Sequence, residues 1–464
     1  MRVTVGDIVE ATGGVLRNGT PDTVVSSFIN DSRRAEPGAC FVAIEAERDG
    51  HDFVDSAVAA GATCLLVRRG GVSTSADVAV VEVPDTMAAL AAVAAAVRRT
   101  YLDAATVVGV TGSTGKTSTK DLLVAALRER VRTHANVESF NNEIGLPLTL
   151  LGAPDDSEVV VAEMGARFAG NIADLCAIAR PDIGVITNIG TAHAEHLGGP
   201  TGILRVKGEL VEALPPHGLA VVPDDDTGTA LAARTAAAVV RVGPSSTADV
   251  QVAVLGLDDD LHATVRIEGP WGRCETRLGL RGAHQAVNAA MAAAVARHCG
   301  VDLEAVATGL AAAHGSKWRM DLQRSPLGVL VINDAYNANP ASMMAAIDAL
   351  AAVGASGRRI AVLGAMRELG ELSAEAHAAV GVRLVQRSID MLVAVGADGE
   401  VIADAAVEAG GLATVERVPD ADSATALLRS EIARGDVVLV KASRAVGLER
   451  VAEALLGLGE GHPS

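Results

Sequence analysis

Residues 109–118 read Gly109-Val110-Thr111-Gly112-Ser113-Thr114-Gly115-Lys116-Thr117-Ser118. The segment overlaps an apolar run from Thr106 to Val110 and leads into a helical pattern from Asp121 to Leu127. Glycines in such a turn let backbone N–H groups surround phosphates, and the start of the helix adds partial positive charge. Lys116 is then placed to reach the β- and γ-phosphates of a nucleotide, and the Thr117 hydroxyl to bind Mg²⁺. The segment therefore predicts a phosphate-binding loop.

The spacing departs from the usual G-x-x-x-x-G-K-[ST] pattern, because Val110 occupies the first glycine position and Gly109 lies one residue earlier. A chance glycine-rich turn is the alternative interpretation. The order of strand, loop and helix, with Lys116 and Thr117 in their expected places, favours the phosphate loop.

Two polar residues further along are candidate metal ligands. Glu163 follows the apolar run Val159–Ala162, and a carboxylate at the carboxyl end of a parallel strand can face a phosphate loop. His193 lies beyond another such run, Ile183–Ile186. Taken singly, an acid at a strand end is more often solvated and a lone histidine more often structural. Their order after a phosphate loop favours metal binding.

The apolar runs as a whole predict an α/β protein of three domains, over residues 1–104, 105–316 and 317–464. The first domain mixes short strands, at Ala39–Ile44 and Ala62–Val67, with an alanine-rich helix over 86–100. The second has a parallel sheet wrapped by helices, with a further strand at Leu219–Val222. The third is doubly wound and Rossmann-like, with strands at Val329–Ile332, Ile360–Leu363, Met391–Val395, Thr414–Val418 and Val437–Val440. No G-x-G-x-x-G follows its first strand, so a dinucleotide site there is not supported.

Composition excludes several classes of protein. Of 464 residues, 49% are hydrophobic and 21% charged, which is typical of a globular chain and excludes wholesale disorder. A net charge of −18 without a visible basic patch argues against a nucleic-acid partner. The longest apolar run, Met87–Val97, is short of the ~20 residues of a membrane span, and no leader peptide opens the chain. Five scattered cysteines favour reduced thiols in a cytoplasmic protein.

Further motifs are spread along nearly the whole chain. They are Asn141–Pro147, Glu163–Gly165, Asn188–His196, Lys207–Leu210, Gly282–Asn288, Trp318–Met320 and Lys441–Arg444. Together with the phosphate loop they resemble the Mur ligases, ATP-dependent enzymes that form amide bonds in peptidoglycan synthesis. Within that family, Asp334–Ser342 and Met366–Glu371 are similar to the last ligase of the series, and Asp31–Arg34 and Asp49–Phe53 to the UDP-sugar-binding domain of the last two.

The resemblance implies roles for particular residues. The loop from Gly112 to Ser118, with Lys116, would hold the phosphates of ATP. Thr117 and Glu163 would bind one Mg²⁺, and His193 a second, together with a carbamate formed on Lys207. Asn288 would contact adenine, Arg319 the phosphates and Asp334 the ribose of ATP. Lys116, His193 and Lys207 would be catalytic. Residues implied in substrate binding are Ser32, Arg33, Asn141, Asn142, Asn337, Asn339, Ser342, Lys441, Ser443 and Arg444.

The activity implied by the resemblance is the joining of D-alanyl-D-alanine to UDP-MurNAc-tripeptide through an acyl phosphate, with ATP and two Mg²⁺, by a cytoplasmic monomer. Departures from the family pattern are Pro223, Ala365, Gln285 and Ala442. Pro223 would remove one nucleotide contact and Ala365 bears on a contact with the incoming dipeptide, and neither of these two touches the phosphate and metal positions. The third residue of the acceptor, diaminopimelate or lysine, and the base for the incoming amine stay open.

Other activities are weighed against this one. A ligase that adds diaminopimelate or lysine one step earlier would carry a D-N-P-[RN] motif and a Tyr-Ala-His segment, and neither is present. A folylpolyglutamate synthase shares the phosphate loop but lacks the UDP-binding domain. The loop alone would also fit a P-loop NTPase without ligase activity, whereas a non-enzymatic scaffold would not need Lys116 and Thr117 in this arrangement.

Overall fold

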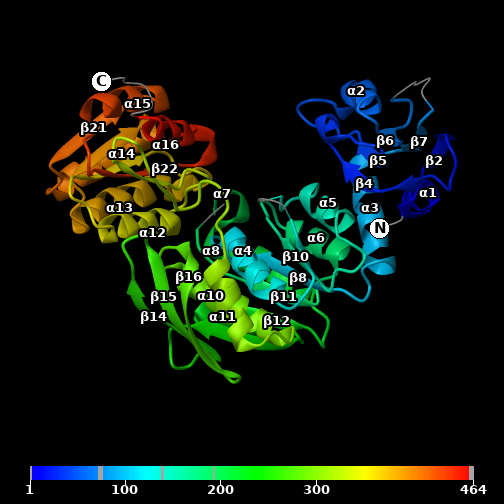
Figure 1. Cartoon of the computed structure of the whole chain (residues 1–464), viewed down its shortest axis with the longest axis horizontal. Coiled ribbons are helices and arrows are strands. Elements are labelled where there is room, and N and C mark those ends of the chain that lie inside the picture. The colour runs from blue at the N-terminus through cyan, green and yellow to red at the C-terminus, as the bar shows by residue number, and fades with distance from the viewer. Residues whose placement is uncertain (1–2, 72–76, 137–139, 192–193, 459–464) are drawn as a thin grey trace.

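The structure is a computed structural model and describes residues 3–71, 77–136, 140–191 and 194–458. Three lobes form an arch, with the central lobe at its base and the two chain ends in opposite lobes (Figure 1). Each lobe is built on its own β-sheet, of five, nine and six strands along the chain. The expected α/β class with three sheet-bearing units is confirmed. Among the described residues, no helix has both the length and the apolar character needed to cross a bilayer.

The N-terminal lobe contains a sheet in the order β2-β7-β6-β5-β4, in which only β2 is antiparallel to its neighbour. Its strands are β2 (Val15–Asn18), β4 (Ser27–Ile29), β5 (Ala39–Val42), β6 (Cys64–Arg68) and β7 (Ala79–Val83), with a separate pair β1 (Val3–Thr4) and β3 (Val24–Val25). Its helices are α1 (Val5–Thr12), α2 (Val54–Ala59) and α3 (Thr86–Thr100). Cys40 and Cys64 are buried neighbours on β5 and β6, and the five cysteines are free thiols.

Helix α3 joins the N-terminal lobe to the central lobe. It contains the apolar run Met87–Val97 and packs against α5 (Gly145–Leu151) and α6 (Asn171–Ala179) of the central lobe. Arg98, only 6% exposed, donates hydrogen bonds to the carbonyl oxygens of Leu102, Ala179 and Arg180 and to the Asp182 carboxylate at 3.1 Å. A buried guanidinium with so many acceptors fixes the end of α3.

The central lobe has a nine-stranded sheet in the order β16-β15-β14-β13-β12-β11-β8-β10-β9. The parallel strands are β8 (Thr106–Thr111), β9 (Thr133–Ala135), β10 (Val159–Glu163), β11 (Ile183–Ile186), β12 (Leu219–Pro223) and β13 (Ala238–Gly243). The sequence did not predict β14 (Val250–Leu257), which pairs in parallel with β13, or β15 (His262–Gly269) and β16 (Gly272–Arg281), which follow it in antiparallel pairings. The expected purely parallel sheet is therefore corrected to a mixed one.

Helices cover both faces of this central sheet. They are α4 (Lys116–Arg128), α5, α6, α8 (Gly199–Glu212), α9 (Asp226–Ala232), α10 (Gln285–His298) and α11 (Leu303–Ala312), with a short α7 (Ala194–Leu197). Strands β10, β8 and β11 are adjacent and fully buried, as expected for Val- and Ile-rich parallel strands. Since their carboxyl ends share one edge of the sheet, the segments that follow Thr111, Glu163 and Ile186 meet there.

The C-terminal lobe has a six-stranded sheet in the order β17-β18-β22-β19-β20-β21, parallel except for β17 (Asp321–Arg324). The other strands are β18 (Leu330–Asn333), β19 (Arg359–Leu363), β20 (Met391–Val395), β21 (Thr414–Val418) and β22 (Val437–Lys441). Helices α12 (Pro340–Ala352), α13 (Ser373–Gln386), α14 (Gly396–Ala409), α15 (Ala421–Glu431) and α16 (Glu449–Leu456) cover it. Apolar clusters lie on both faces, as in a doubly wound sheet.

The central lobe reaches into the C-terminal lobe through the turn between β14 and β15. Leu261 in this turn has a left-handed backbone (φ +65°) and is fully buried. It belongs to the apolar core of the C-terminal lobe, with Met343 and Ile347. A second contact joins the backbone N–H of Glu195 in α7 to the carbonyl of Glu368, at 3.3 Å. These contacts and the linker before β17 hold the two lobes together.

Candidate nucleotide site

The loop between β8 and α4 has a backbone that requires glycine at Gly112. The φ of Gly112 is +145°, and a Cβ there would lie 1.9 Å from the Thr187 hydroxyl oxygen. Gly115 also has a positive φ, +77°, directly before the first residue of α4. The loop therefore takes the turn expected of a phosphate-binding loop, with backbone N–H groups at the N-terminus of a long helix.

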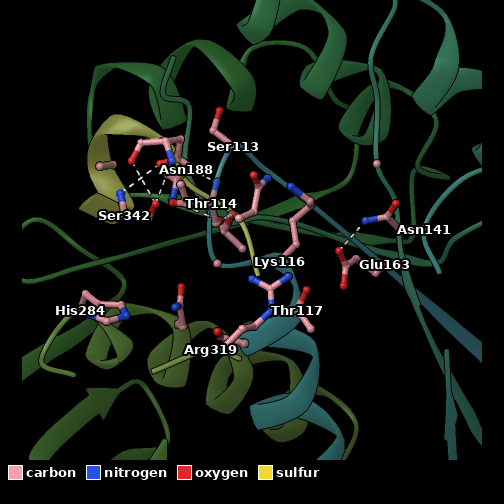
Figure 2. Close-up of a pocket in the computed structure, with 18 of the residues that line it drawn as sticks. Ser113, Thr114, Lys116, Thr117, Asn141, Glu163, Asn188, His284, Arg319 and Ser342 are labelled. Carbon is pink, nitrogen blue, oxygen red and sulfur yellow. Dashed lines mark hydrogen bonds between the residues drawn. The ribbon is translucent and has the colours of Figure 1, made fainter. Parts of the chain in front are cut away.

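The segment after β11 holds this loop in place. The Thr114 N–H donates to Asn188 Oδ1 at 3.0 Å, and Asn188 Nδ2 donates to Thr114 Oγ1 at 2.6 Å, as Figure 2 shows. The Thr187 hydroxyl donates to the Thr114 carbonyl at 2.5 Å, and the Gly190 N–H to Ser113 Oγ at 2.9 Å. The motifs in the sequence predict no role for Thr187 or Asn188 by themselves. Their place directly after a buried strand beside β8 is the signal that indicates one.

Lys116 lies across the loop. Its Nζ donates to the Gly112 carbonyl at 2.8 Å, which closes the turn around the space where phosphates would lie. Burial lowers the pKa of Lys116 from its ordinary value, and the nearby Glu163 carboxylate acts in the opposite direction. An anion in the loop would stabilise the charged ammonium further.

Glu163 and Lys207 have buried polar atoms that need a partner. Glu163 is 1% exposed; its Oε1 accepts from Asn141 Nδ2 at 2.7 Å, while Oε2 has no hydrogen-bond partner among the described residues (Figure 2). Lys207 on α8 is fully buried, and its Nζ likewise has none within the described part of the chain. Burial, together with the charge of Lys116, holds the pKa of Lys207 well below its ordinary value. A buried carboxylate oxygen without a partner among the described residues, next to a nucleotide loop, fits a site completed by a cation.

The implied metal ligands divide into two groups. Thr117 and Glu163 both line the same cavity, whereas His193 lies outside the described residues. Among the described residues, three possible metal ligands come together elsewhere, at Glu45, Asp49 and His51 of the N-terminal lobe. His51 bonds Asp49 through Nδ1 at 2.6 Å and accepts the Arg68 N–H through Nε2 at 2.9 Å. With both ring nitrogens in use, this trio is not a metal site.

A cavity of about 1190 Å³ lies between the central and C-terminal lobes. The residues singled out from the sequence that line it are Ser113, Thr114, Gly115, Lys116, Thr117, Ser118, Asn141, Asn142, Glu163, Asn288, Arg319, Asp334, Asn337, Asn339, Ser342 and Lys441. Those outside its lining are Gly112, Lys207, Ser443, Arg444, Ser32 and Arg33. Residues distant in sequence are thus brought together around the phosphate loop.

One end of the cavity suits a flat apolar ring. Pro223 and Pro244, with Gly243 and Val287, line it close to Asn288, whose side chain donates to Gln285 Oε1 at 2.8 Å. From the sequence, Pro223 is a departure from the family pattern that bears on a nucleotide contact, and the other three residues carry no predicted role. Pro223 and Gly243 end the parallel strands β12 and β13, so the edge where such sheets bind ligands would have indicated them.

The C-terminal lobe contributes a buried ion pair to the cavity. Lys441 Nζ lies 2.6 Å from Asp334 Oδ2 and also donates to the Asn337 carbonyl at 2.9 Å. The other oxygen of Asp334 accepts the Met320 N–H at 3.0 Å. The Arg319 guanidinium lies over the Tyr336 ring, 4.2 Å from its centroid. Asp334 and Lys441 thus also tie the linker segment to the end of the C-terminal sheet.

Four of the implied substrate-binding residues have contacts within the lobe. Asn339 and Ser342 form a capping box at the start of α12, with the Ser342 N–H donating to Asn339 Oδ1 at 3.0 Å. Ser443 Oγ accepts the Arg367 N–H at 2.9 Å, and the Arg444 guanidinium lies 4.1 Å from the centroid of the Trp318 ring. These contacts stabilise α12, the turn after β19 and the linker.

In the N-terminal lobe, Ser32 and Arg33 lie in a short 3₁₀ turn capped by Asp31. Arg33 pairs with Asp31 at 2.7 Å, with 87% of the arginine side chain exposed. Hydrogen bonds from Arg33 lower the pKa of Asp31 to about 2. This turn is separate from the cavity between the other two lobes.

Models of protein families match three parts of the chain. The family described as Mur ligase family, catalytic domain, matches residues 26–98, the Mur ligase middle domain residues 110–296, and the Mur ligase, glutamate ligase domain residues 318–444.

Individual proteins match over nearly the whole chain. A relative named UDP-N-acetylmuramoyl-tripeptide–D-alanyl-D-alanine ligase, from Mycobacterium tuberculosis H37Rv, is 40% identical over 98% of both chains. A crystal structure of MurF from Acinetobacter baumannii has a TM-score of 0.86 at 31% identity, over 98% of this chain and 99% of that one. MurF from Thermotoga maritima, solved in complex with ADP, has a TM-score of 0.79 at 31% identity, over 93% and 97%.

Proposed function

This chain belongs to the Mur ligase family, and we infer from that membership that it is the ATP-dependent ligase that joins D-alanyl-D-alanine to UDP-N-acetylmuramoyl-tripeptide. The observation that carries the inference is full-length similarity to ligases of this one activity, at 40% identity. The phosphate loop with Lys116, at the edge of a cavity closed by a second lobe, is the site such a reaction needs. The reaction completes the peptide of a peptidoglycan precursor.

We propose that the three parts of the chain bind different ligands. Residues 1–104 would bind the UDP-sugar end of the acceptor, with Ser32 and Arg33 in the exposed turn. Residues 105–316 would bind ATP, with the base between Pro223 and Val287 near Asn288 and the phosphates at the loop. Residues 317–464 would cover the nucleotide with Arg319 and Asp334 and present the dipeptide near Asn337 and Lys441.

We further propose that Mg²⁺ binds here and that Lys207 is carbamylated. Thr117 and Glu163 would hold one ion through hydroxyl and carboxylate oxygens, and the carbamate on Lys207 would help hold a second, with His193. Support comes from the buried Glu163 Oε2, which lacks a partner among the described residues, and from the low pKa of Lys207, since carbamylation requires a neutral amine. When bound, the cations would offset the negative charge that builds up between ATP and the acceptor carboxylate.

The chemistry follows from charge. A carboxylate is a poor acylating agent, so the acceptor carboxylate would first take the γ-phosphoryl group and become an acyl phosphate. That step brings two anions together, and Lys116 and the N–H groups at the start of α4 would stabilise the transferring group. The neutral amine of the dipeptide would then attack the acyl carbon, and inorganic phosphate would leave.

Product analysis tests this function. Incubation with UDP-MurNAc-tripeptide, D-alanyl-D-alanine and Mg-ATP should yield UDP-MurNAc-pentapeptide, ADP and phosphate, measured by mass spectrometry. With D-alanyl-D-alanine omitted, phosphate release should be nearly absent, which separates a ligase from a P-loop NTPase. Formation of tripeptide from a dipeptide acceptor and a diamino acid would instead identify the ligase one step earlier. We propose that the enzyme acts as a monomer in the cytoplasm, where ATP is available.

A further inference from the structure

A chain of polar contacts outside the nucleotide cavity begins at the linker between two lobes. Ser316 Oγ donates to Asp121 Oδ2 of helix α4 at 2.7 Å. The other oxygen of Asp121 lies 3.1 Å from the ammonium of its neighbour, Lys120. The linker is thereby attached to the same helix whose first turn carries Lys116 and Thr117.

The chain of contacts continues from Lys120 to the candidate metal ligand Glu163. Lys120 Nζ donates to the Asn136 carbonyl at 3.1 Å. The Asn136 side chain accepts the backbone N–H of Glu163, also at 3.1 Å. Asn136 thus accepts a hydrogen bond from Lys120 through its backbone carbonyl and one from the Glu163 N–H through its side chain.

Burial indicates that these contacts are specific. Lys120 is 3% exposed and Asn136 5% exposed, and an ammonium buried to this extent is destabilising unless acceptors surround it. Neither Lys120 nor Asp121 is among the described residues that line the nucleotide cavity. Any effect of the pair on the reaction must therefore act through other residues.

Ser316 lies at the point where the chain passes to the C-terminal lobe. Two residues later the Trp318 carbonyl accepts the Tyr336 N–H at 3.2 Å, and the Trp318 ring lies under the Arg444 guanidinium. Trp318 and Met320 both have left-handed backbones, with φ of +60° and +50°. The residues after Ser316 are thus bound to the C-terminal lobe, and Ser316 is bound to the central lobe.

We propose that Lys120 and Asp121 are positioning residues that couple the joint at Ser316 to the orientation of the Glu163 carboxylate. Movement of the C-terminal lobe at this joint would be transmitted through α4 to Asn136, and so to the strand end that carries Glu163. The inference rests on the proposed function, in which Glu163 binds a cation beside ATP.

The first experiment replaces Lys120 with methionine, which keeps the length of the side chain and removes the charge. Residues that hydrogen-bond to a metal ligand affect metal affinity about 10- to 100-fold. Lys120→Met should therefore raise the Mg²⁺ concentration for half-maximal ligation about tenfold. Calorimetric titration of Mg²⁺ into protein saturated with ADP should show the same loss of affinity. KM for the acceptor should stay at the wild-type value, which a general loss of structure would not allow.

The second experiment tests the coupling itself. Ser316→Ala removes one hydroxyl from a half-buried linker position and should also raise the Mg²⁺ requirement, by less than Lys120→Met. If both act through one chain of contacts, the double variant should match Lys120→Met alone. Thr308→Ala is the matched control, because it removes an exposed hydroxyl that donates to the Glu304 carbonyl of its own helix, and it should behave as wild type.

Several outcomes would overturn the coupling. The first is an Mg²⁺ concentration for half-maximal ligation by Lys120→Met within about twofold of the wild-type value. The second is a double variant whose Mg²⁺ requirement rises by the product of the two single effects. If Lys120→Met fails to fold, Ser316→Ala decides alone: a raised Mg²⁺ requirement supports the coupling, and an unchanged one overturns it. Absence of ligation by the wild-type protein would instead contradict the proposed function.

Discussion

Lys116 is the side chain on which we expect phosphate transfer to depend most directly. Among the described residues its Nζ donates to the Gly112 carbonyl alone, so its loss removes charge from the phosphate site and little packing. We expect Lys116→Ala to abolish ligation while its thermal melt stays close to wild type. A residual rate above about a tenth of wild type, a loss of less than ~1.4 kcal/mol in transition-state stabilisation, would mean that the loop does not bind ATP.

Lys207 is expected to work as a carbamate. Lys207→Ala should be nearly inactive, and short-chain carboxylates such as acetate should restore part of the activity, because a free carboxylate can occupy the space left by the carbamate. The measurement is ligation rate against carboxylate concentration. Full activity of Lys207→Ala without additive would contradict the carbamate.

A variant on the same helix controls for general effects of the additive. Arg205 is exposed on α8, two residues before Lys207, so Arg205→Ala should keep its activity with or without carboxylate. Rescue confined to the Lys207 variant would tie the effect to that one buried position.

At the scale of single residues, the sequence predicts the functional residues that belong to a local motif. Lys116 belongs to this group because it follows a glycine-rich loop at the start of a helix, and Glu163 because it ends a buried strand. Asn188 and Arg98 do not, since their partners lie 74 and 81 residues away. Such contacts depend on which strands and helices become neighbours, and no local pattern specifies that.

Helix α12 shows how an element combines two roles. Its first turn lines the cavity, and its capping box satisfies backbone groups that helix formation leaves unpaired. We expect Asn339→Ala to destabilise the protein by about 1 kcal/mol and to lower kcat/KM, because the start of the helix would lose its position. Denaturant unfolding and steady-state kinetics would measure the two effects.

Asp420 provides the control for this prediction. It caps α15 through the Ser423 N–H at 2.8 Å and lies outside the residues that line the cavity. Asp420→Ala should cost a similar amount of stability, about 1 kcal/mol, with ligation kinetics unchanged. Equal kinetic losses in both variants would mean that stability, rather than the position of α12, limits activity.

Among the elements, buried parallel strands were the easiest to predict. β11 and β20 are buried throughout and have the ends expected from their apolar runs. The antiparallel pairings of β15 and β16 were missed because these two strands are partly exposed and interleave apolar with polar or charged residues. A search for continuous apolar runs does not detect such strands.

For the whole molecule, Arg98 is the residue that joins two lobes. We expect Arg98→Met to destabilise the protein by about 3 kcal/mol, since Asp182 and buried carbonyl groups would lose their donor. Calorimetry should show the N-terminal lobe melting apart from the rest. Arg99→Met, at the exposed neighbouring position, should melt as wild type. A single wild-type transition for Arg98→Met would show that apolar packing of α3 is sufficient.

The separation of the N-terminal turn from the nucleotide cavity leads to a further expectation. The double variant Ser32→Ala with Arg33→Ala should bind UDP-MurNAc-tripeptide more weakly and bind ATP as wild type does, as measured by calorimetry. The turn is exposed and makes few contacts with the core, so stability should change little. Equal losses for both ligands would indicate misfolding instead.

The position of α3 has a consequence for exchanging parts between related enzymes. The chain order assigns this helix to the N-terminal lobe, which we propose binds the acceptor. Its partners α5 and α6, and the groups of Ala179 and Asp182 that accept hydrogen bonds from Arg98, belong to the central lobe. A chimera joined after Thr100 would bring a foreign helix into a recipient that lacks matching side chains. A chimera joined between β7 and α3 would instead keep the α3 helix of the recipient. A chimera designed to transfer acceptor preference should therefore be joined at that point.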